Sequence, residues 1–176
     1  KKQLCTNNAF DEAAKNGHLE IVKWLHIHLK RIDVSPNDMS ISICTYSAVD
    51  WAAENGHLEM VKWLLTNRTE GYQYAVDLAA REGHLDIIKW IYYNCKDDFK
   101  VFKAIDLAAG AKTTNITFTK INRFYEDELL YLDIIKFLYS VSGSKSFTTD
   151  AVDYAATNNY FKIVEWFFDN RHDLLV

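Results

Sequence analysis

Three histidines recur in the same short motif and raise the question of a metal site. His18, His57 and His84 each follow a glycine and precede a leucine. Zinc needs its nitrogen ligands at about 2 Å from the ion. If the histidines belong to helices that pack side by side, equivalent residues are separated by roughly 8–10 Å. Histidines at that spacing cannot close on one metal, and we interpret each as a turn histidine that bonds nearby backbone.

A second ladder consists of carboxylates and raises the question of acid–base catalysis. Five aspartates share one position of the repeated pattern: Asp11, Asp50, Asp77, Asp106 and Asp153. Carboxylates that catalyse together in glycosidases lie about 5–9.5 Å apart. Neighbouring members of this ladder reach that range only at its upper end. We therefore expect no catalytic pair.

The aspartates have a structural alternative as helix caps. Ser47 stands three residues before Asp50, and Asp150 three residues before Asp153. A Ser or Asp followed three residues later by an acid is a capping-box arrangement, which satisfies the free amides of a helix's first turn. The explanation is incomplete, because Tyr74 and Lys103 occupy the cap position in two other copies.

Other candidate sites are weaker. His26 and His28 form a His-x-His near the end of an expected helix, without a third histidine or a cysteine nearby, so surface histidines are favoured over a metal site. "SGSKS" at 142–146 lacks the leading glycine and spacing of a phosphate-binding loop. Since no nucleophile and base can be paired either, we predict no enzyme activity, no metal and no cofactor.

Composition narrows the class of protein. The 176 residues carry a net charge of −4, which does not favour nucleic acid or an anionic membrane as a partner. No apolar run reaches the ~20 residues that a membrane span requires. Cys5, Cys44 and Cys95 have neither zinc spacing nor an even count. Reduced thiols in the cytoplasm or nucleus are expected, with a lone reactive thiol as the alternative.

These residues are placed by an internal repeat. "AVDWAAENGHLEMVKWL" begins at Ala48 and returns as "AVDLAAREGHLDIIKWI" from Ala75. Five copies begin near the alanines at 9, 48, 75, 104 and 151. Each copy indicates an alanine-rich helix, a glycine break and a second helix whose apolar stripe in copy two is Leu58, Val61, Leu64 and Leu65. Periods of this size indicate a solenoid of stacked hairpins, here one domain over residues 1–176.

One position of the second helix is aromatic in every copy. Its members are Trp24, Trp63, Trp90, Phe137 and Trp166. We predict packing between repeats, and a stacking platform for a ligand is the alternative.

"NGHLEIVKWL" at 16–25 and its relatives resemble the second half of an ankyrin repeat. Copies one to three carry the motif well, and copies four and five are degraded. The Thr-Pro-Leu-His opening of ankyrin repeats is missing, and 27 residues separate Ala48 from Ala75 where about 33 are usual. Short inter-repeat turns are therefore expected. The sequence resembles the divergent ankyrin arrays common in giant viruses and some protists, which would place it in the host cytoplasm if it is viral.

The resemblance implies an all-α solenoid that binds another protein on its concave surface. Its contact residues would come from the ends of the first helices and from the segments before them. The first set is Lys15, Asn16, Glu54, Asn55, Arg81, Glu82, Thr157 and Asn158. The second set is Thr45, Tyr46, Tyr72, Gln73, Phe102, Lys103 and Thr149. Tyr46, Tyr72 and Phe102 are the expected hot spots, unless these aromatics only cover the shortened turns.

Two insertions interrupt the pattern. Residues 26–47 separate copies one and two, and residues 110–131 replace the Gly-His-Leu turn of copy four. "EDELL" within the second insertion is interpreted as the acidic first turn of a lengthened helix. A partner site in this loop and tolerated drift both remain open.

The functional prediction is a monomeric interaction module or adaptor. Two alternatives stay open: the targeting segment of a larger enzyme or ubiquitin-ligase adaptor, and a structural spacer in an assembly.

Overall fold

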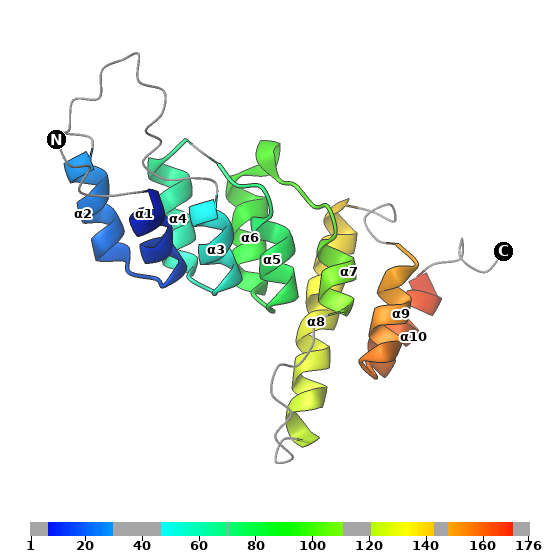
Figure 1. Ribbon diagram of the computed structural model, residues 1–176. Helices are drawn as coiled ribbons and strands as arrows, with labels where there is room; N and C mark the ends of the chain where they lie inside the picture. Colours follow the sequence, from blue (N-terminus) through cyan, green and yellow to red (C-terminus); the bar gives the residue numbers. More distant parts are fainter. Residues whose placement is uncertain (1–6, 30–46, 70, 111–120, 143–147, 171–176) are drawn as a thin grey trace. The chain divides into compact units, whose positions relative to one another are not determined.

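The computed structural model describes residues 7–29, 47–69, 71–110, 121–142 and 148–170 (Figure 1). Within these ranges the regular structure is helical and contains no strand. The α-helices are α1 (Asn7–Lys15), α2 (Leu19–Leu29), α3 (Ser47–Glu54), α4 (Leu58–Asn67), α5 (Ala75–Arg81), α6 (Leu85–Asn94), α7 (Ala104–Ala109), α8 (Ile121–Ser142), α9 (Asp150–Thr157) and α10 (Phe161–Asn170). A short 3-10 helix, η1 (Lys96–Asp98), follows α6. Each predicted repeat forms one helix pair, so the all-α repeat fold is confirmed.

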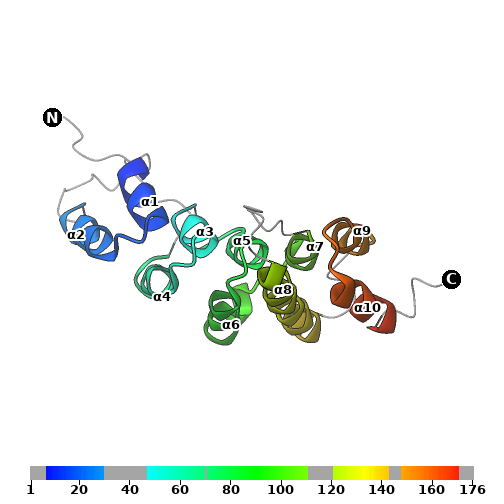
Figure 2. The same cartoon turned by 90° about the horizontal axis from the view of Figure 1, so that it is seen from below.

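The chain divides into two compact units, Lys1–Ala75 and Val76–Val176. In the first unit, α1 and α3 lie in one layer, and α2 and α4 lie in a second (Figure 2). In the second unit, α5, α7 and α9 form one layer, and α6, α8 and α10 form the other (Figure 2). Each unit is therefore a stack of helical hairpins in two layers.

Small side chains let the first helices of neighbouring repeats approach closely. Ala52 and Ala53 are fully buried in α3, and the matching alanine pairs of α5 and α7 are fully buried too. In α4 the buried residues are Met60, Val61 and Leu64. The predicted stripe was correct at Val61 and Leu64, whereas Leu58 and Leu65 are only half-buried. The core thus lies between the two layers and between successive hairpins.

A glycine in the left-handed region separates the two helices in each of the first three repeats. Gly17 has φ +72°, and an L side chain at such a φ costs about 1–2 kcal/mol. The imidazole of His57, from the next repeat, lies 2.8 Å from the point where a Cβ on Gly17 would stand. In the fifth repeat Asn159 takes this position with φ +59°. Asparagine tolerates this conformation better than most residues, which explains how the degraded copy keeps its turn.

The fourth repeat departs from the pattern through the length of its second helix. Helix α8 runs for 22 residues from Ile121, so residues 121–131 of the predicted insertion are helical. The lengthening was predicted correctly. The placement of "EDELL" was wrong, because the first turn of α8 contains no acid and Glu126–Leu130 lie further along the helix. The rest of the insertion, 111–120, lies outside the described residues, as does most of the other insertion, 30–46.

Gly17→Ala is expected to destabilise the chain more than Gly71→Ala. Both glycines have φ near +70°, but a Cβ at Gly71 would meet nothing within 4 Å. Backbone strain is therefore common to both variants, and the overlap with His57 is specific to Gly17→Ala. Urea denaturation followed by circular dichroism should show the larger loss at Gly17. Adding His57→Ala should remove the difference; equal losses in the two single variants would contradict the contact.

Candidate functional site

The aspartate ladder holds the chain that leads into the next repeat. We call the residues just before each first helix the leading segment: 71–74 before α5, 100–103 before α7 and 148–149 before α9. Asp50 Oδ1 accepts hydrogen bonds from the backbone amides of Gln73 at 3.1 Å and Tyr74 at 3.0 Å. One buried carboxylate thus fixes two successive amides of the leading segment that follows it.

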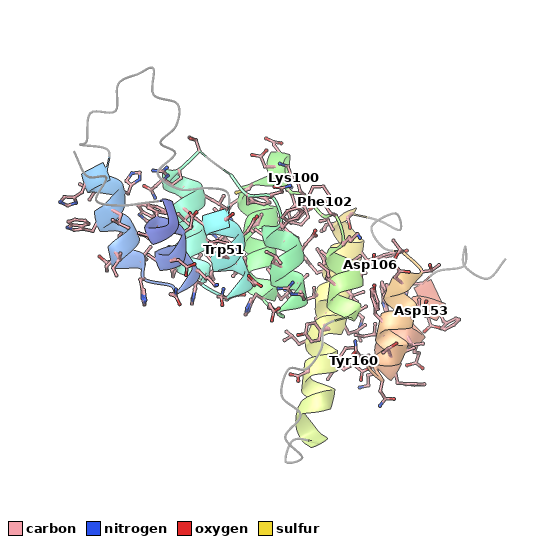
Figure 3. The ribbon with its side chains drawn as sticks, in the orientation of Figure 1. Trp51, Lys100, Phe102, Asp106, Asp153 and Tyr160 are labelled. Atoms are coloured by element: carbon pink, nitrogen blue, oxygen red, sulfur yellow. The ribbon has the colours of Figure 1, made fainter. Side chains whose placement is uncertain are left out.

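The same contact recurs twice in the second unit. Asp77 Oδ1 accepts the amide of Phe102 at 3.1 Å, and both oxygens of Asp77 accept the amide of Lys103 at 3.3 Å. Asp106 accepts the Thr148 amide at 2.9 Å and the Thr148 hydroxyl at 3.0 Å. Figure 3 shows Phe102 close to the start of α7 and Asp106 within that helix. The contact therefore recurs from α3, α5 and α7 to the leading segment that follows each of them.

The capping-box prediction did not foresee the bonds that Asp50, Asp77 and Asp106 make across repeats. The amides that donate to these carboxylates lie in the following repeat. Tyr74 and Lys103, which fitted the capping explanation poorly, are two of the donors, because any non-proline residue offers a backbone N–H. Sequence reasoning missed this role. The available signal was an acid that recurs in every copy while the residue three positions earlier changes.

The aspartates of the ladder differ in how deeply they are buried. Asp11, Asp50, Asp77 and Asp106 are buried, whereas Asp153 in the last repeat is exposed. Within the described residues the carboxylate of Asp153 accepts no hydrogen bond. The ladder thus has one member whose side chain faces solvent.

Burial also sets the protonation chemistry of Asp50. Desolvation raises the pKa of Asp50 above 3.8, and the amides of Tyr74, Gln73 and Ala75 act in the opposite direction because they favour the charged form. Asp50, Asp77 and Asp106 each accept hydrogen bonds from backbone amides of the following leading segment.

The histidine ladder lies at the turns between paired helices. His57 and His84 precede α4 and α6, and neither side chain caps its helix. The ring of His57, which was predicted to bond nearby backbone, covers Gly17. Within the described ranges no cluster of His, Cys, Asp and Glu has the arrangement that a metal ion requires.

His26 and His28 lie in the last turn of α2, not beyond it. The Arg68 guanidinium lies 3.1 Å from His26 Nδ1, and the ring of His28 stacks on Trp24 with centroids 3.9 Å apart. Both rings thus have packing roles.

The aromatic position joins neighbouring repeats, as predicted. The ring two residues beyond it in one repeat meets the aromatic ring of the next, edge to face. His26 meets Trp63 at 5.2 Å, Tyr92 meets Phe137 at 5.6 Å, and Tyr139 meets Trp166 at 5.2 Å between centroids. Such edge contacts add about 0.5–1.5 kcal/mol each beyond burial.

The predicted contact residues at the ends of the first helices are exposed or half-buried, and some bond to their own helix and others to a neighbouring one. Asn16 and Asn55 donate side-chain hydrogen bonds to the carbonyls of Glu12 and Trp51. The Thr157 hydroxyl donates to the carbonyl of Asp153, and the Asn158 side chain donates to the carbonyl of Ala109. Arg81 and Glu82 form an ion pair at 2.8 Å. The Lys15 ammonium lies over the ring of Trp51, 5.6 Å from its centroid. Glu54 is half-buried.

The leading segments differ from the prediction at their aromatic residues. Tyr72 is 6% exposed, so its side chain covers the shortened turn and offers no contact surface to a partner. Phe102 is 56% exposed, as a hot spot requires, and Lys103 and Thr149 are also exposed. Thr45 and Tyr46 lie outside the described residues. Gln73 is half-buried.

Tyr74 is a surface residue that sequence reasoning missed. Its ring is exposed, and its hydroxyl accepts a hydrogen bond from Gln73 Nε2 at 2.8 Å. The sequence carries no signal that separates its exposed ring from the buried ring of Tyr72.

A buried polar cluster replaces the missing turn of the fourth repeat. Glu128 is buried in α8 and accepts the amide of Lys162 at 2.6 Å, so it satisfies the start of α10. Tyr131 donates to the carbonyl of Arg81 at 3.3 Å, and burial, with help from Glu82 and Asp127, raises its pKa to about 12. Burial likewise raises the pKa of the neighbouring Tyr160. These phenols stay neutral and structural.

Comparison with known proteins identifies the family to which these repeats are similar. A family model described as ankyrin repeats (three copies) matches residues 8–102, more than half of the chain. The chain belongs to the ankyrin-repeat family. The match covers the first three ankyrin repeats, and the fourth and fifth hairpins keep the aspartate and aromatic contacts beyond it. No curated protein matches the sequence.

None of the helices in the described ranges combines the length and the apolar character that crossing a bilayer demands.

Asp77→Ala is expected to lower the free energy of unfolding by about 1–3 kcal/mol, because two amides lose their acceptor. Asp153→Ala is the matched control at the equivalent position, where the change should stay within about 0.5 kcal/mol. Urea denaturation of dilute protein measures both. Losses of similar size in the two variants would show that the inter-repeat bonds do not account for the ladder.

Proposed function

We propose that this ankyrin-repeat protein is a protein-binding module whose contact groups are the exposed rings of the leading segments, Tyr74 in the first unit and Phe102 in the second. Ankyrin repeats are generally protein-interaction modules, and this family membership sets the class of function. The observation that carries the specific surface is the exposure of Phe102 and Tyr74 on backbone that buried aspartates hold in place.

Anchoring matters because binding is costly when loops must be ordered. The amides on which Tyr74 and Phe102 stand already donate to Asp50 and Asp77, so little backbone entropy is lost when a partner binds. An exposed aromatic ring on a fixed backbone is the kind of group that dominates binding energy at interfaces. A large apolar side chain held in water also has surface to bury.

Each exposed ring has a polar neighbour in its own leading segment. Lys103 is exposed beside Phe102, and Gln73 donates to the hydroxyl of Tyr74. Charges at an interface rim mainly tune association rate and partner choice. Each ring therefore suits a protein partner that buries an apolar group next to polar ones.

Catalysis is not part of the proposal. The carboxylates that recur in the repeats are engaged with backbone amides at Asp50, Asp77 and Asp106. The recurring histidines lie at turns, and the ring of His57 packs on backbone. We therefore assign a structural role to these recurring polar residues and the binding role to the exposed aromatic side chains.

Phe102→Ala and Tyr74→Ala are each expected to weaken partner binding, by about 2 kcal/mol where the ring is a hot spot. The partner would be isolated by affinity capture from native cells, and its Kd for each variant measured by titration calorimetry with purified proteins. Tyr93→Ala is the control, since Tyr93 is an exposed aromatic on the second-helix layer.

Circular dichroism should show that all three variants fold. Unchanged affinity for Phe102→Ala and Tyr74→Ala, or a loss confined to Tyr93→Ala, would overturn the assignment of this surface.

A further inference from the structure

The outer face of the last hairpin carries the groups that elsewhere hold a following repeat. Asp153 occupies the ladder position on α9 but is exposed (Figure 3). Val164 is half-buried, whereas its equivalents are fully buried: Val22, Val61, Ile88 and Ile135. Phe168, at the position of the rings that meet the next aromatic, is 55% exposed. We call Asp153, Val164 and Phe168 the trailing face.

The outer face of the first hairpin shows the converse pattern. Ile21 is 51% exposed, whereas its equivalent Met60 is 2% exposed and the other equivalents, Ile87, Ile134 and Ile163, are fully buried. Trp24 is 56% exposed, and the other four members of the aromatic position are half-buried. Ala9 is exposed, although the alanines that open the other four repeats are fully buried. We call Ala9, Ile21 and Trp24 the receiving face.

We propose that the trailing face of one copy of this chain docks on the receiving face of a second copy, head to tail. The two faces fit because they are the two halves of a contact that the chain already makes within each unit. In that contact a ring such as Tyr139 meets the aromatic ring of the next repeat, Trp166. Across the interface, Phe168 of one copy takes the place of Tyr139, and Trp24 of the second copy takes the place of Trp166.

The aspartate contact can be completed in the same way. Asp50 and Asp77 bind the two amides immediately before the alanine that opens the next repeat. The equivalent amides of the first repeat belong to Asn7 and Asn8, in the first turn of α1. The first four amides of a helix have no partner within the helix, so they can donate to Asp153 of the second copy.

A second copy is favoured as the occupant because both halves are present on this chain. "FDEAAKNGHLEIVKWL" of the first repeat is close to "VDWAAENGHLEMVKWL" of the second, whose receiving side is already packed against a trailing side. A heterologous contact of this kind leaves one face of each kind unpaired in a dimer, so wild-type protein should form species larger than a dimer as its concentration rises. This assembly would replace the monomer expected from the sequence.

The test is sedimentation velocity on the full 176-residue chain over a wide range of concentrations. Wild type is expected to shift to larger species as concentration rises. Phe168→Lys blocks the trailing face and Ile21→Lys blocks the receiving face, so each variant alone should stay monomeric. An equimolar mixture should form a 1:1 dimer and nothing larger, because one intact face of each kind remains.

Ile27→Lys is the matched control on the same helix as Ile21. Ile27 is exposed, and so are its equivalents in every other repeat: Thr66, Tyr93, Ser140 and Asp169. This variant should associate as wild type does, whereas Phe168→Lys and Ile21→Lys should weaken association at least about tenfold, or about 1.4 kcal/mol.

Circular dichroism would confirm that the variants fold, since each changes a side chain that is already half in water. A wild type that stays monomeric at every concentration would overturn the proposal. So would an equimolar mixture that stays monomeric, or a loss in Ile27→Lys as large as that in Ile21→Lys.

Discussion

A buried carboxylate that accepts amides from the next repeat is the contact on which the stack depends. Without a hydrogen-bond partner, a buried ion costs several kcal/mol, so Asp50 and Asp77 are tolerated only because the following leading segment supplies amides to them. The leading segment in turn has no regular structure of its own and is fixed by these bonds. Each repeat therefore needs the next one, which is why the ladder ends in an exposed aspartate where no further hairpin follows among the described residues.

This dependence explains how degraded repeats keep the fold. The fourth repeat has lost its Gly-His-Leu turn, yet Asp106 still binds Thr148, and Tyr139 still meets Trp166. Glu128, a buried acid in the lengthened α8, satisfies the start of α10. Contacts between repeats thus hold hairpins that their own turns specify poorly. The same contacts hold the surface rings in place, so the stability and the proposed binding function rest on one set of groups.

Sequence reasoning predicts the helices well and their contacts unevenly. The alternation of alanines, a glycine and an apolar stripe is local information, and it places the helix pairs correctly, including α9 and α10. The aromatic contacts also follow from one recurring position. The partner of Asp50 does not, because a backbone amide leaves no mark on the sequence and a capping box offers a plausible local alternative.

At the leading segments, too, the sequence predicts the local structure but not which side chain is exposed. That residues 71–74 lie in a short turn follows from the reduced repeat period. Which ring is buried there, Tyr72 or Tyr74, depends on how the shortened turn crosses the hairpin below it, and nothing in the order Tyr-Gln-Tyr decides this. Phe102, for which the sequence left the same two readings open, is exposed.

Amide hydrogen exchange at the leading segments tests the central contact most directly. Exchange measured by NMR on the folded chain should be slow at Gln73, Tyr74, Phe102 and Lys103, although none of these residues lies in a helix or strand. The bonds to Asp50 and Asp77 are the reason for that protection. Exchange of these four amides at the rate of an unstructured peptide would contradict the account.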